Sequence, residues 1–309
     1  MSEGAKKIGL IIGQEWDWPE AFMQAINASD ANITAELVQL GGTFMDEPCD
    51  YAVIIDRISH EIPYYKAYLK YAAIQGTYII NNPFTCSADS KFSSTALVNR
   101  LGLKSPRTVV LPNKQVDKDV TPSTFRNLKY PMDWQAIIDY VGVPAIFKDN
   151  LASGRRGVHR VHNVDELIQR YDESSTRTKI LQQIIESDEH VHCFVIGQEK
   201  VLSLPYSVKH GRYQQNSLAN DEGKGKQLAQ DALRISRAYR YDINMVEFVI
   251  KDGIAYVING TYPTPDIDLT LMTENQFQWL VQEIVALAIE RAQRPLPQAG
   301  IFNQLESNS

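Results

Sequence analysis

The sequence predicts an α/β protein, and three observations support this prediction. Short apolar runs typical of buried strands alternate with longer segments of helical periodicity along most of the 309 residues. The first run, residues 7–13, is almost entirely apolar and ends in glycine, which is typical of a strand buried on both faces. Near the other end, the apolar runs 246–250 and 254–258 flank Asp252-Gly253, the strongest short signal of a β-hairpin.

The composition favours a protein with a sizeable core, because 44% of the residues are hydrophobic and the chain is long enough for two or three lobes. The net charge of −6 comes from interspersed acids and bases, which argues against a nucleic-acid-binding surface. Three widely spaced cysteines without a C-x-x-C pair are typical of a reduced compartment. We see no signal peptide and no apolar run of membrane-spanning length, so a soluble, cytoplasmic protein is predicted.

The N-terminal part is predicted to be a small α/β domain with a partly parallel sheet. Its expected strands are 7–13, 33–40, 51–56 and 77–81, and its expected helices are 18–28 and 62–75. Loops that follow the carboxyl ends of such strands meet ligands, so residues 14–18 form a candidate substrate loop. The alternative is a polar turn with two packed indoles, those of Trp16 and Trp18.

The rest of the chain continues the alternation. Expected strands are 108–111, 144–148, 158–161, 179–185, 191–196 and 200–204, and expected helices are 87–101, 134–141, 163–174, 223–239 and 274–294. Residues 207–220 are expected to be polar and irregular. Three features are candidates for a functional site: Lys148 at a strand end, the glycine-bearing loop 149–157 after it, and Glu247 on the hairpin. Taken alone, each has an ordinary alternative as a solvated lysine, a turn or a surface acid.

The order of the parts is more informative than any one of them. In sequence they are D-S-K, G-L-K-S-P-R-T, P-A-I-F-K with its loop, I-L-Q-Q-I-I-E, the V-H-C-F-V-I-G-Q-E-K-V hairpin and the V-E-F-V-I-K-D-G-I-A-Y-V-I-N hairpin. Over roughly residues 7–292 this succession resembles the ATP-grasp superfamily, the fold of D-alanine–D-alanine ligase, glutathione synthetase and ribosomal-protein glutamate ligases. The resemblance implies a small α/β pre-ATP-grasp domain, followed by two α+β lobes that hold a nucleotide between them.

The implied domains are 1–105 for the pre-ATP-grasp domain, 106–190 for the central lobe with the lid loop, 191–295 for the C-terminal lobe and 296–309 for a tail. The resemblance also assigns site residues. Those implied to bind the nucleotide are Lys91 and Lys148 at the phosphates, Ser153 and Gly154 in the lid, Gln182, Gln183 and Ile185 in the hinge at the adenine edge, and Glu189 at the ribose. Lys209 and Arg212 are the implied catalytic residues.

The metal site departs from the family's pattern. Glu247 matches the acid of the first hairpin strand, but Asn259 stands where the second strand usually carries an acid. Magnesium prefers carboxylate oxygens together with nucleotide phosphates, so Asn259 brings an oxygen without charge. Asp266 and Asp268 follow nearby and are candidates to replace the acid, or they form a solvated acidic loop. His190 and His192 share a strand face but have no third ligand at a suitable spacing.

The resemblance implies an ATP-dependent ligase that joins a carboxylate to an amine through an acyl-phosphate, with ATP and Mg²⁺ as cofactors and small molecules as substrates. The second hypothesis is a catalytically weakened homologue that binds nucleotide or another small ligand as a regulatory or partner subunit. The third is an α/β protein with two lobes around a cleft and no nucleotide, which leaves the placement of Lys91 and Lys148 unexplained. Neither nucleic acid nor a membrane is an expected partner, and the oligomeric state, a homodimer included, stays open.

Overall fold

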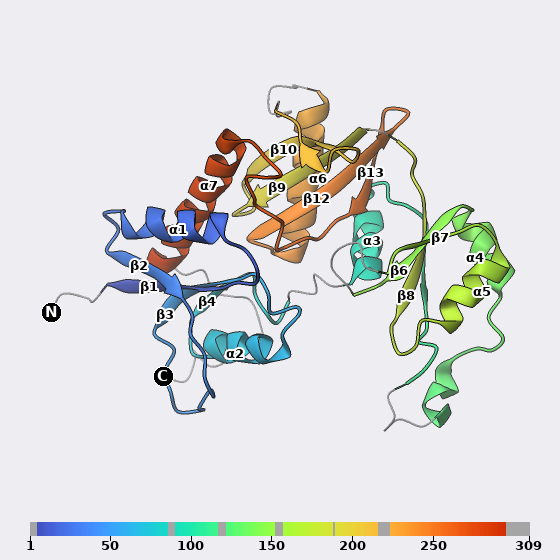
Figure 1. Cartoon of the computed structure of the whole chain (residues 1–309), viewed down its shortest axis with the longest axis horizontal. Coiled ribbons are helices and arrows are strands. Elements are labelled where there is room, and N and C mark those ends of the chain that lie inside the picture. Colours follow the sequence, from blue (N-terminus) through green and yellow to red (C-terminus); the bar gives the residue numbers. More distant parts are fainter. Residues whose placement is uncertain are drawn as a thin grey trace. The chain divides into compact units, whose positions relative to one another are not determined.

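The computed structural model describes residues 5–85, 90–116, 122–151, 157–187, 189–215 and 223–294 (Figure 1). The chain folds into two compact units, each made of separate stretches of sequence. The N-terminal unit comprises Met1–Cys86, His190–Val246 and Thr261–Ser309, and the central unit comprises Ser87–Glu189 and Glu247–Gly260. Mixed helices and strands confirm the predicted α/β class, and each unit is described by itself below.

The N-terminal unit contains a four-stranded sheet in the order β2-β1-β3-β4, and all three strand pairs are parallel. The strands are β1 (Lys6–Ile11), β2 (Ile33–Leu37), β3 (Tyr51–Asp56) and β4 (Tyr78–Ile80). Helix α2 (Pro63–Ile74) covers one face, while α1 (Asp17–Asn27) and α7 (Glu274–Gln293) cover the other (Figure 1). Burial on both faces explains why the central strand β1 is a continuous apolar run, as the sequence indicated, whereas the edge strand β2 alternates between buried and exposed residues.

Helix α1 shows how the sequence produces this packing. Trp18, Phe22 and Ile26 recur at intervals of four and therefore share one face of the helix, and all three are buried. The preceding residue, Trp16, has an indole that is 81% exposed. Only one of the two indoles in the loop after β1 is therefore packed, and the interpretation of a turn with two packed indoles is wrong for Trp16.

A second sheet has the order β11-β10-β9-β12-β13. Its strands are β9 (Glu189–Ile196), β10 (Lys200–Ser207), β11 (Arg212–Tyr213), β12 (Ile243–Lys251) and β13 (Ile254–Asn259). Helix α6 (Lys224–Tyr239) packs on β10. The prediction that residues 207–220 are irregular is wrong at β11, because a strand of two residues leaves no periodic pattern to read.

The sheet of the central unit is antiparallel throughout, in the order β5-β8-β6-β7. Its elements are α3 (Lys91–Arg100), β5 (Thr108–Leu111), the 3₁₀ helix η1 (Pro122–Asn127), α4 (Trp134–Val141), β6 (Ala145–Asp149), β7 (His159–Val161), α5 (Val164–Asp172) and β8 (Lys179–Gln183). Leu111, Phe147 and Leu181 form a core with residues of α4 and α5. These two helices lie against one face of the sheet (Figure 1). By the two-residue period of strands, Lys148 and Gln182 point to the opposite face.

The predicted hairpin at Asp252-Gly253 is confirmed. Both residues have positive φ, 51° and 75°, as a two-residue turn of type I′ requires. The strands that it joins pair in antiparallel register, with Glu247 opposite Asn259. Among the described residues, no helix is long and apolar enough to span a membrane.

Candidate functional site

Lys148 lies near the end of β6, on the face of the central sheet opposite the core with α4 and α5. We call this face the polar face, because it carries Thr108, Gln182 and Lys148. Lys148 pairs with Ile180 of β8, and Ile146, two residues earlier on β6, pairs with Gln182. Lys148 and Gln182 are therefore diagonal neighbours on one face, which is within reach of long side chains. The Lys148 ammonium donates a 2.8 Å hydrogen bond to Gln182 Oε1. The strand-end lysine is thus held by a neutral amide.

The Gln182 amide is itself fixed from its other side. Thr108 of β5 lies directly opposite Gln182, and its Oγ1 accepts a 3.0 Å hydrogen bond from Gln182 Nε2. The Thr108 hydroxyl in turn donates to the Pro106 carbonyl oxygen at 3.0 Å. Gln182 and Thr108 are both buried, so these bonds satisfy polar groups that water does not reach.

The other predicted phosphate lysine is brought to the same place by Asn150. The Asn150 carbonyl accepts from the Lys91 N–H at 3.0 Å, and its side-chain Oδ1 accepts from the Phe92 N–H at 3.0 Å. These bonds satisfy two of the backbone donors that the first turn of α3 leaves without an intrahelical partner. As a result, the N-terminus of α3 is attached next to the end of β6, and Lys91 lies near Lys148.

The surroundings of Lys148 lower its pKa to about 8. Burial is the largest cause, because it disfavours the charged ammonium, and the positive charge of Lys91 acts in the same direction. Glu247 acts in the opposite direction and raises the pKa. The three residues therefore interact within the central unit. Their roles toward nucleotide phosphates and a metal stay predictions. A concentration of positive charge of this kind suits the phosphates of a nucleotide.

The next residue, Asp149, points to the other face and has a different environment. Its carboxylate forms ion pairs with Lys179, directly opposite on β8, and with Arg177 at 2.9 Å. Burial alone would raise the pKa of Asp149, but the hydrogen bonds and charges of Lys179 and Arg177 hold it below its usual value. Asp149 therefore neutralises Lys179 and is not directed at the face that carries Lys148.

Glu247 and Asn259 are cross-strand neighbours, and Asn259 Nδ2 donates a 3.2 Å hydrogen bond to Glu247 Oε1. The amide thus directs its nitrogen, and not its oxygen, at the carboxylate. Among the residues that the structure describes, no three His, Cys, Asp or Glu side chains lie close enough together to hold a metal ion. Magnesium uses one or two carboxylates plus phosphate oxygens, so these residues fit the metal only through Glu247.

The predicted hinge lies at the end of β8. Gln183 exchanges bonds with Arg107: its N–H donates to the Arg107 carbonyl at 2.9 Å, and its Oε1 accepts from the Arg107 N–H at 3.2 Å. Ile185 lies beyond the last residue of β8 and is partly exposed, and Glu189 is exposed at the start of β9. Their roles toward adenine and ribose stay predictions. Ser153 and Gly154 of the predicted lid lie outside the described residues.

The two predicted catalytic residues belong to the N-terminal unit. Arg212 opens β11 and pairs with Ser207, and Lys209 lies in the intervening turn; both side chains are exposed. Lys91, Lys148 and Glu247 belong to the central unit. The catalytic roles of Lys209 and Arg212 stay predictions.

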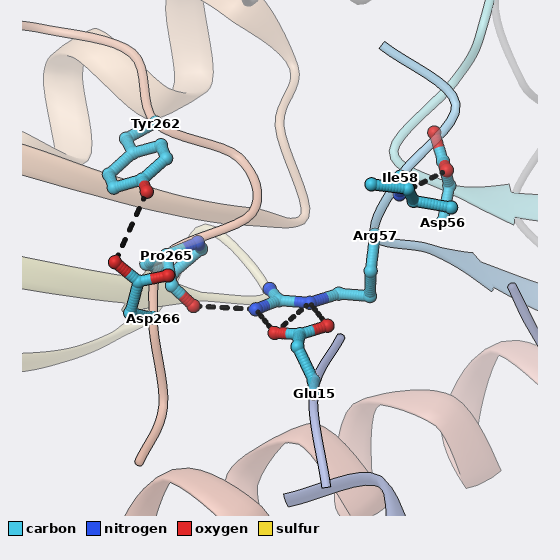
Figure 2. Close-up of polar contacts among 7 residues, drawn as sticks. All are labelled: Glu15, Asp56, Arg57, Ile58, Tyr262, Pro265 and Asp266. Atoms are coloured by element: carbon cyan, nitrogen blue, oxygen red, sulfur yellow. Dashed lines mark hydrogen bonds and ion pairs between the residues drawn. The ribbon is translucent and has the colours of Figure 1, made fainter. Parts of the chain in front are cut away.

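A second polar cluster lies in the N-terminal unit, where the loops after β1 and β3 meet the segment after β13 (Figure 2). The Arg57 guanidinium is buried, forms a bidentate ion pair with Glu15 and donates a 2.6 Å hydrogen bond to the Pro265 carbonyl. Arg57 also lies 5.0 Å above the Trp18 ring. The Glu15 carboxylate of the candidate substrate loop is therefore committed to an internal partner.

Asp266, a candidate replacement for the missing metal acid, lies beside this cluster (Figure 2). Its carboxylate accepts a 3.4 Å hydrogen bond from the Tyr262 hydroxyl. Desolvation raises the pKa of Asp266, and the charge of Arg57 lowers it in part. Asp266 and Asp268 belong to the N-terminal unit, whereas Glu247 belongs to the central unit. Their service as metal ligands stays a prediction.

The sequence did not indicate three of the organising residues, namely Thr108, Asn150 and Arg57. Arg57 follows directly after a strand of a parallel sheet, a position that could have marked it. Thr108 and Asn150 act through partners on neighbouring elements. Their roles depend on strand register, which no local pattern contains.

Comparisons with known proteins identify similar folds among solved structures. No protein-family model matches the chain, and no curated protein sequence matches it. Solved structures do match over nearly the whole length. A RimK domain ATP-grasp protein from Sphaerobacter thermophilus is 16% identical, with 93% of this chain and 98% of that chain covered and a TM-score of 0.63. A D-alanine–D-alanine ligase from Bacillus anthracis, solved with ATP, is 17% identical, with 94% and 98% covered and a TM-score of 0.63.

The ATP-grasp ligase PsnB, solved with a precursor peptide and AMPPNP, is 14% identical, with 93% of this chain and 99% of that chain covered and a TM-score of 0.61. At these identities the similarity concerns the fold. It agrees with the ATP-grasp fold that the succession of strands and helices in the sequence implied. The chain has the ATP-grasp fold.

Proposed function

We propose that the protein is an ATP-dependent ligase that joins a carboxylate to an amine through an acyl-phosphate. The observation that supports this proposal most directly is the arrangement of Lys91 and Lys148 at one end of the central sheet. Lys148 is held by the neutral amide of Gln182, so its charge is not spent on a hydrogen-bonded carboxylate. Lys91 and Lys148 concentrate positive charge at this end of the sheet, and a polyphosphate is an anion that such a concentration attracts.

In the proposed reaction, a carboxylate oxygen of the first substrate attacks the γ-phosphorus of ATP, and ADP leaves. The amine of the second substrate then attacks the acyl carbon, loses a proton and expels inorganic phosphate. Lys91 and Lys148 bind phosphate oxygens and offset the negative charge that shifts during transfer. Bound magnesium would supply further charge neutralisation, with Glu247 as its protein ligand.

The proteins with similar structures support the general class of this reaction. They include a D-alanine–D-alanine ligase with ATP, and the ligase PsnB with a peptide and AMPPNP or with magnesium and ADP. Small carboxylates and amines, amino acids and short peptides included, are the substrates that we assign to the present chain. We place the reaction in the cytoplasm, with no role for nucleic acid or membrane.

Release of inorganic phosphate tests the proposal. The chain is incubated with ATP and pools of amino acids and dipeptides, with and without magnesium, and the Lys148→Ala variant serves as the control for contaminating hydrolases. We expect release that depends on a substrate pool and that falls by two decades or more in the variant, since loss of one aimed donor costs about that much. Equal release by both proteins would contradict the proposal.

A second function is favoured by one observation, the hydrogen bond from Asn259 Nδ2 to Glu247. An amide that occupies the carboxylate weakens the metal site, and a weakened member of this fold would bind nucleotide as a regulatory or partner subunit. ATP binding without phosphate release from any pool, with or without magnesium, is the outcome that this alternative predicts. Turnover in the presence of magnesium excludes it.

A further inference from the structure

The polar face of the central sheet carries a row of three side chains across three adjacent strands. Thr108 of β5 lies opposite Gln182 of β8, and Gln182 lies diagonally from Lys148 of β6. Hydrogen bonds of 3.0 Å and 2.8 Å join the three side chains in this order. The strand register therefore places a hydroxyl, an amide and an ammonium in one line, with Pro106 at the end.

This row has a single consistent direction of donation. An ammonium group only donates, so the Gln182 atom that faces Lys148 must be its oxygen. The amide nitrogen then faces Thr108, whose oxygen accepts, and the hydroxyl proton goes to the Pro106 carbonyl, which only accepts. Lys148 thus requires the amide oxygen on its side, and Thr108 supplies the matching acceptor for the amide nitrogen on the other side. Without this hydroxyl, the buried amide nitrogen loses the acceptor that holds it in this orientation.

The charges around Lys148 show why this orientation matters. Among the described residues, the charged groups that shift its pKa are Lys91 at the start of α3 and Glu247 on β12. Lys91 repels the ammonium, Glu247 attracts it, and Gln182 orients it without adding charge. A carboxylate at position 182 would hold the ammonium more tightly and keep it charged, but it would also repel phosphate oxygens.

We propose that Thr108 is a positioning residue that acts through Gln182 to hold the Lys148 ammonium ready for nucleotide phosphate. The inference rests on the proposed binding of ATP. The inference goes beyond ATP binding, because it assigns roles to Thr108 and Gln182 that a phosphate-binding lysine alone does not require.

The expected pH dependence has a definite sign. The pKa of Lys148 is about 8 in the protein without nucleotide, and bound phosphates raise it because an anion favours the ammonium. Binding therefore takes up a proton above pH 8. The affinity for ATP is constant below this pH and falls above it, by up to about tenfold per pH unit.

The test measures the dissociation constant of ATP by calorimetry between pH 7 and pH 9.5, with the full chain. Thr108→Val removes the hydroxyl at nearly constant volume, and we expect about tenfold weaker binding at pH 7, the usual effect of one lost hydrogen bond. Thr108→Ser keeps the hydroxyl and is expected to restore the affinity. Gln182→Glu is expected to bind ATP more weakly at pH 7 and to shift the alkaline decline to higher pH.

A second measurement does not depend on ATP. In protein labelled with ¹³C at lysine Cε, the NMR titration of Lys148 should have its midpoint near pH 8, lower in Thr108→Val and higher in Gln182→Glu. Lys114, an exposed lysine of the same unit that pairs with Asp172, provides the variant Lys114→Ala as a control for both assays.

The outcomes separate the two proposals. If ATP binds to the unaltered protein and Thr108→Val matches Thr108→Ser in affinity and in pH profile, the positioning role is overturned while the proposed function stands. If the Lys148 midpoint is the same in all variants, the role is also overturned. If ATP does not bind at any pH, both proposals fail.

Discussion

Two lysines on opposite faces of the central sheet have opposite surroundings. Lys179 of β8 lies on the face that forms a core with α4 and α5, where Asp149 neutralises it and the Phe147 ring lies 5.7 Å from its ammonium. Lys148 of β6 lies on the other face, where it meets the Gln182 amide and the charge of Lys91. Lys179 is paired with a carboxylate, whereas Lys148 is hydrogen-bonded to a neutral amide.

The difference follows from the period of a strand. Lys148 and Asp149 are consecutive, so their side chains point to opposite faces, and the acid next to the lysine in sequence is unavailable to it. The structural role of Asp149 is to pair with Lys179. The lesson is that two lysines on adjacent strands of one sheet, Lys148 and Lys179, have different partners because they point to opposite faces.

The largest expected effect comes from Asp149→Asn, which leaves Lys179 buried without its carboxylate. Loss of one partner of a buried ion pair costs about 3–5 kcal/mol of unfolding free energy. The equivalent truncation on the other face, Lys148→Met, is expected to change stability by less than about 1 kcal/mol, because it removes a cation that burial and Lys91 already disfavour. Urea unfolding of both variants measures the contrast, and equal losses would show that the two faces do not differ.

The pH dependence of stability sharpens the same contrast. The pKa of Lys148 is about 8 in the folded chain and near 10.5 in the unfolded chain, so the unfolded chain binds more protons between these values. Stability should therefore rise with pH from about 8 to 10.5, by on the order of 1–2 kcal/mol, and Lys148→Met should remove this rise. Urea midpoints at pH 7, 8, 9 and 10 for both proteins give the difference. Parallel pH profiles would contradict the lowered pKa.

Much of the fold could be predicted from the sequence, because each long element carries its own signal. The hairpin at Asp252-Gly253 and the apolar strands of the parallel sheet are local patterns, and the structure has both. Only part of the candidate site could be predicted. Lys91 and Lys148 could be singled out, but the contacts of Lys148 with Gln182, and of Gln182 with Thr108, depend on the register of strands far apart in sequence.

A further prediction concerns the metal. Asn259→Asp places a carboxylate opposite Glu247, so the ATP-induced rise in melting temperature should become more dependent on magnesium, with apparent affinity changing about tenfold between magnesium and EDTA. If the hydrogen bond from Asn259 to Glu247 weakens the metal site, the dependence is small in the unaltered protein. A strong magnesium requirement before substitution would show that Glu247 has other acidic partners.

The smallest effect is expected from Arg177→Ala. Arg177 also pairs with Asp149, but its side chain is 71% exposed, and exposed ion pairs contribute about 0–1 kcal/mol. Asp149 keeps its buried partner Lys179 in this variant. A urea midpoint close to that of the unaltered protein is expected. A loss as large as that of Asp149→Asn would assign the stabilisation to Arg177 and not to Lys179.

The central claim is that the Lys148 face binds ATP, and a thermal melt tests it most directly. Millimolar ATP should raise the melting temperature of the unaltered protein by mass action. Lys148→Ala should abolish that rise, while Lys114→Ala, which removes an exposed lysine of the same unit, should keep it. An unchanged melting curve of the unaltered protein, or an equal rise in Lys148→Ala, would contradict the account.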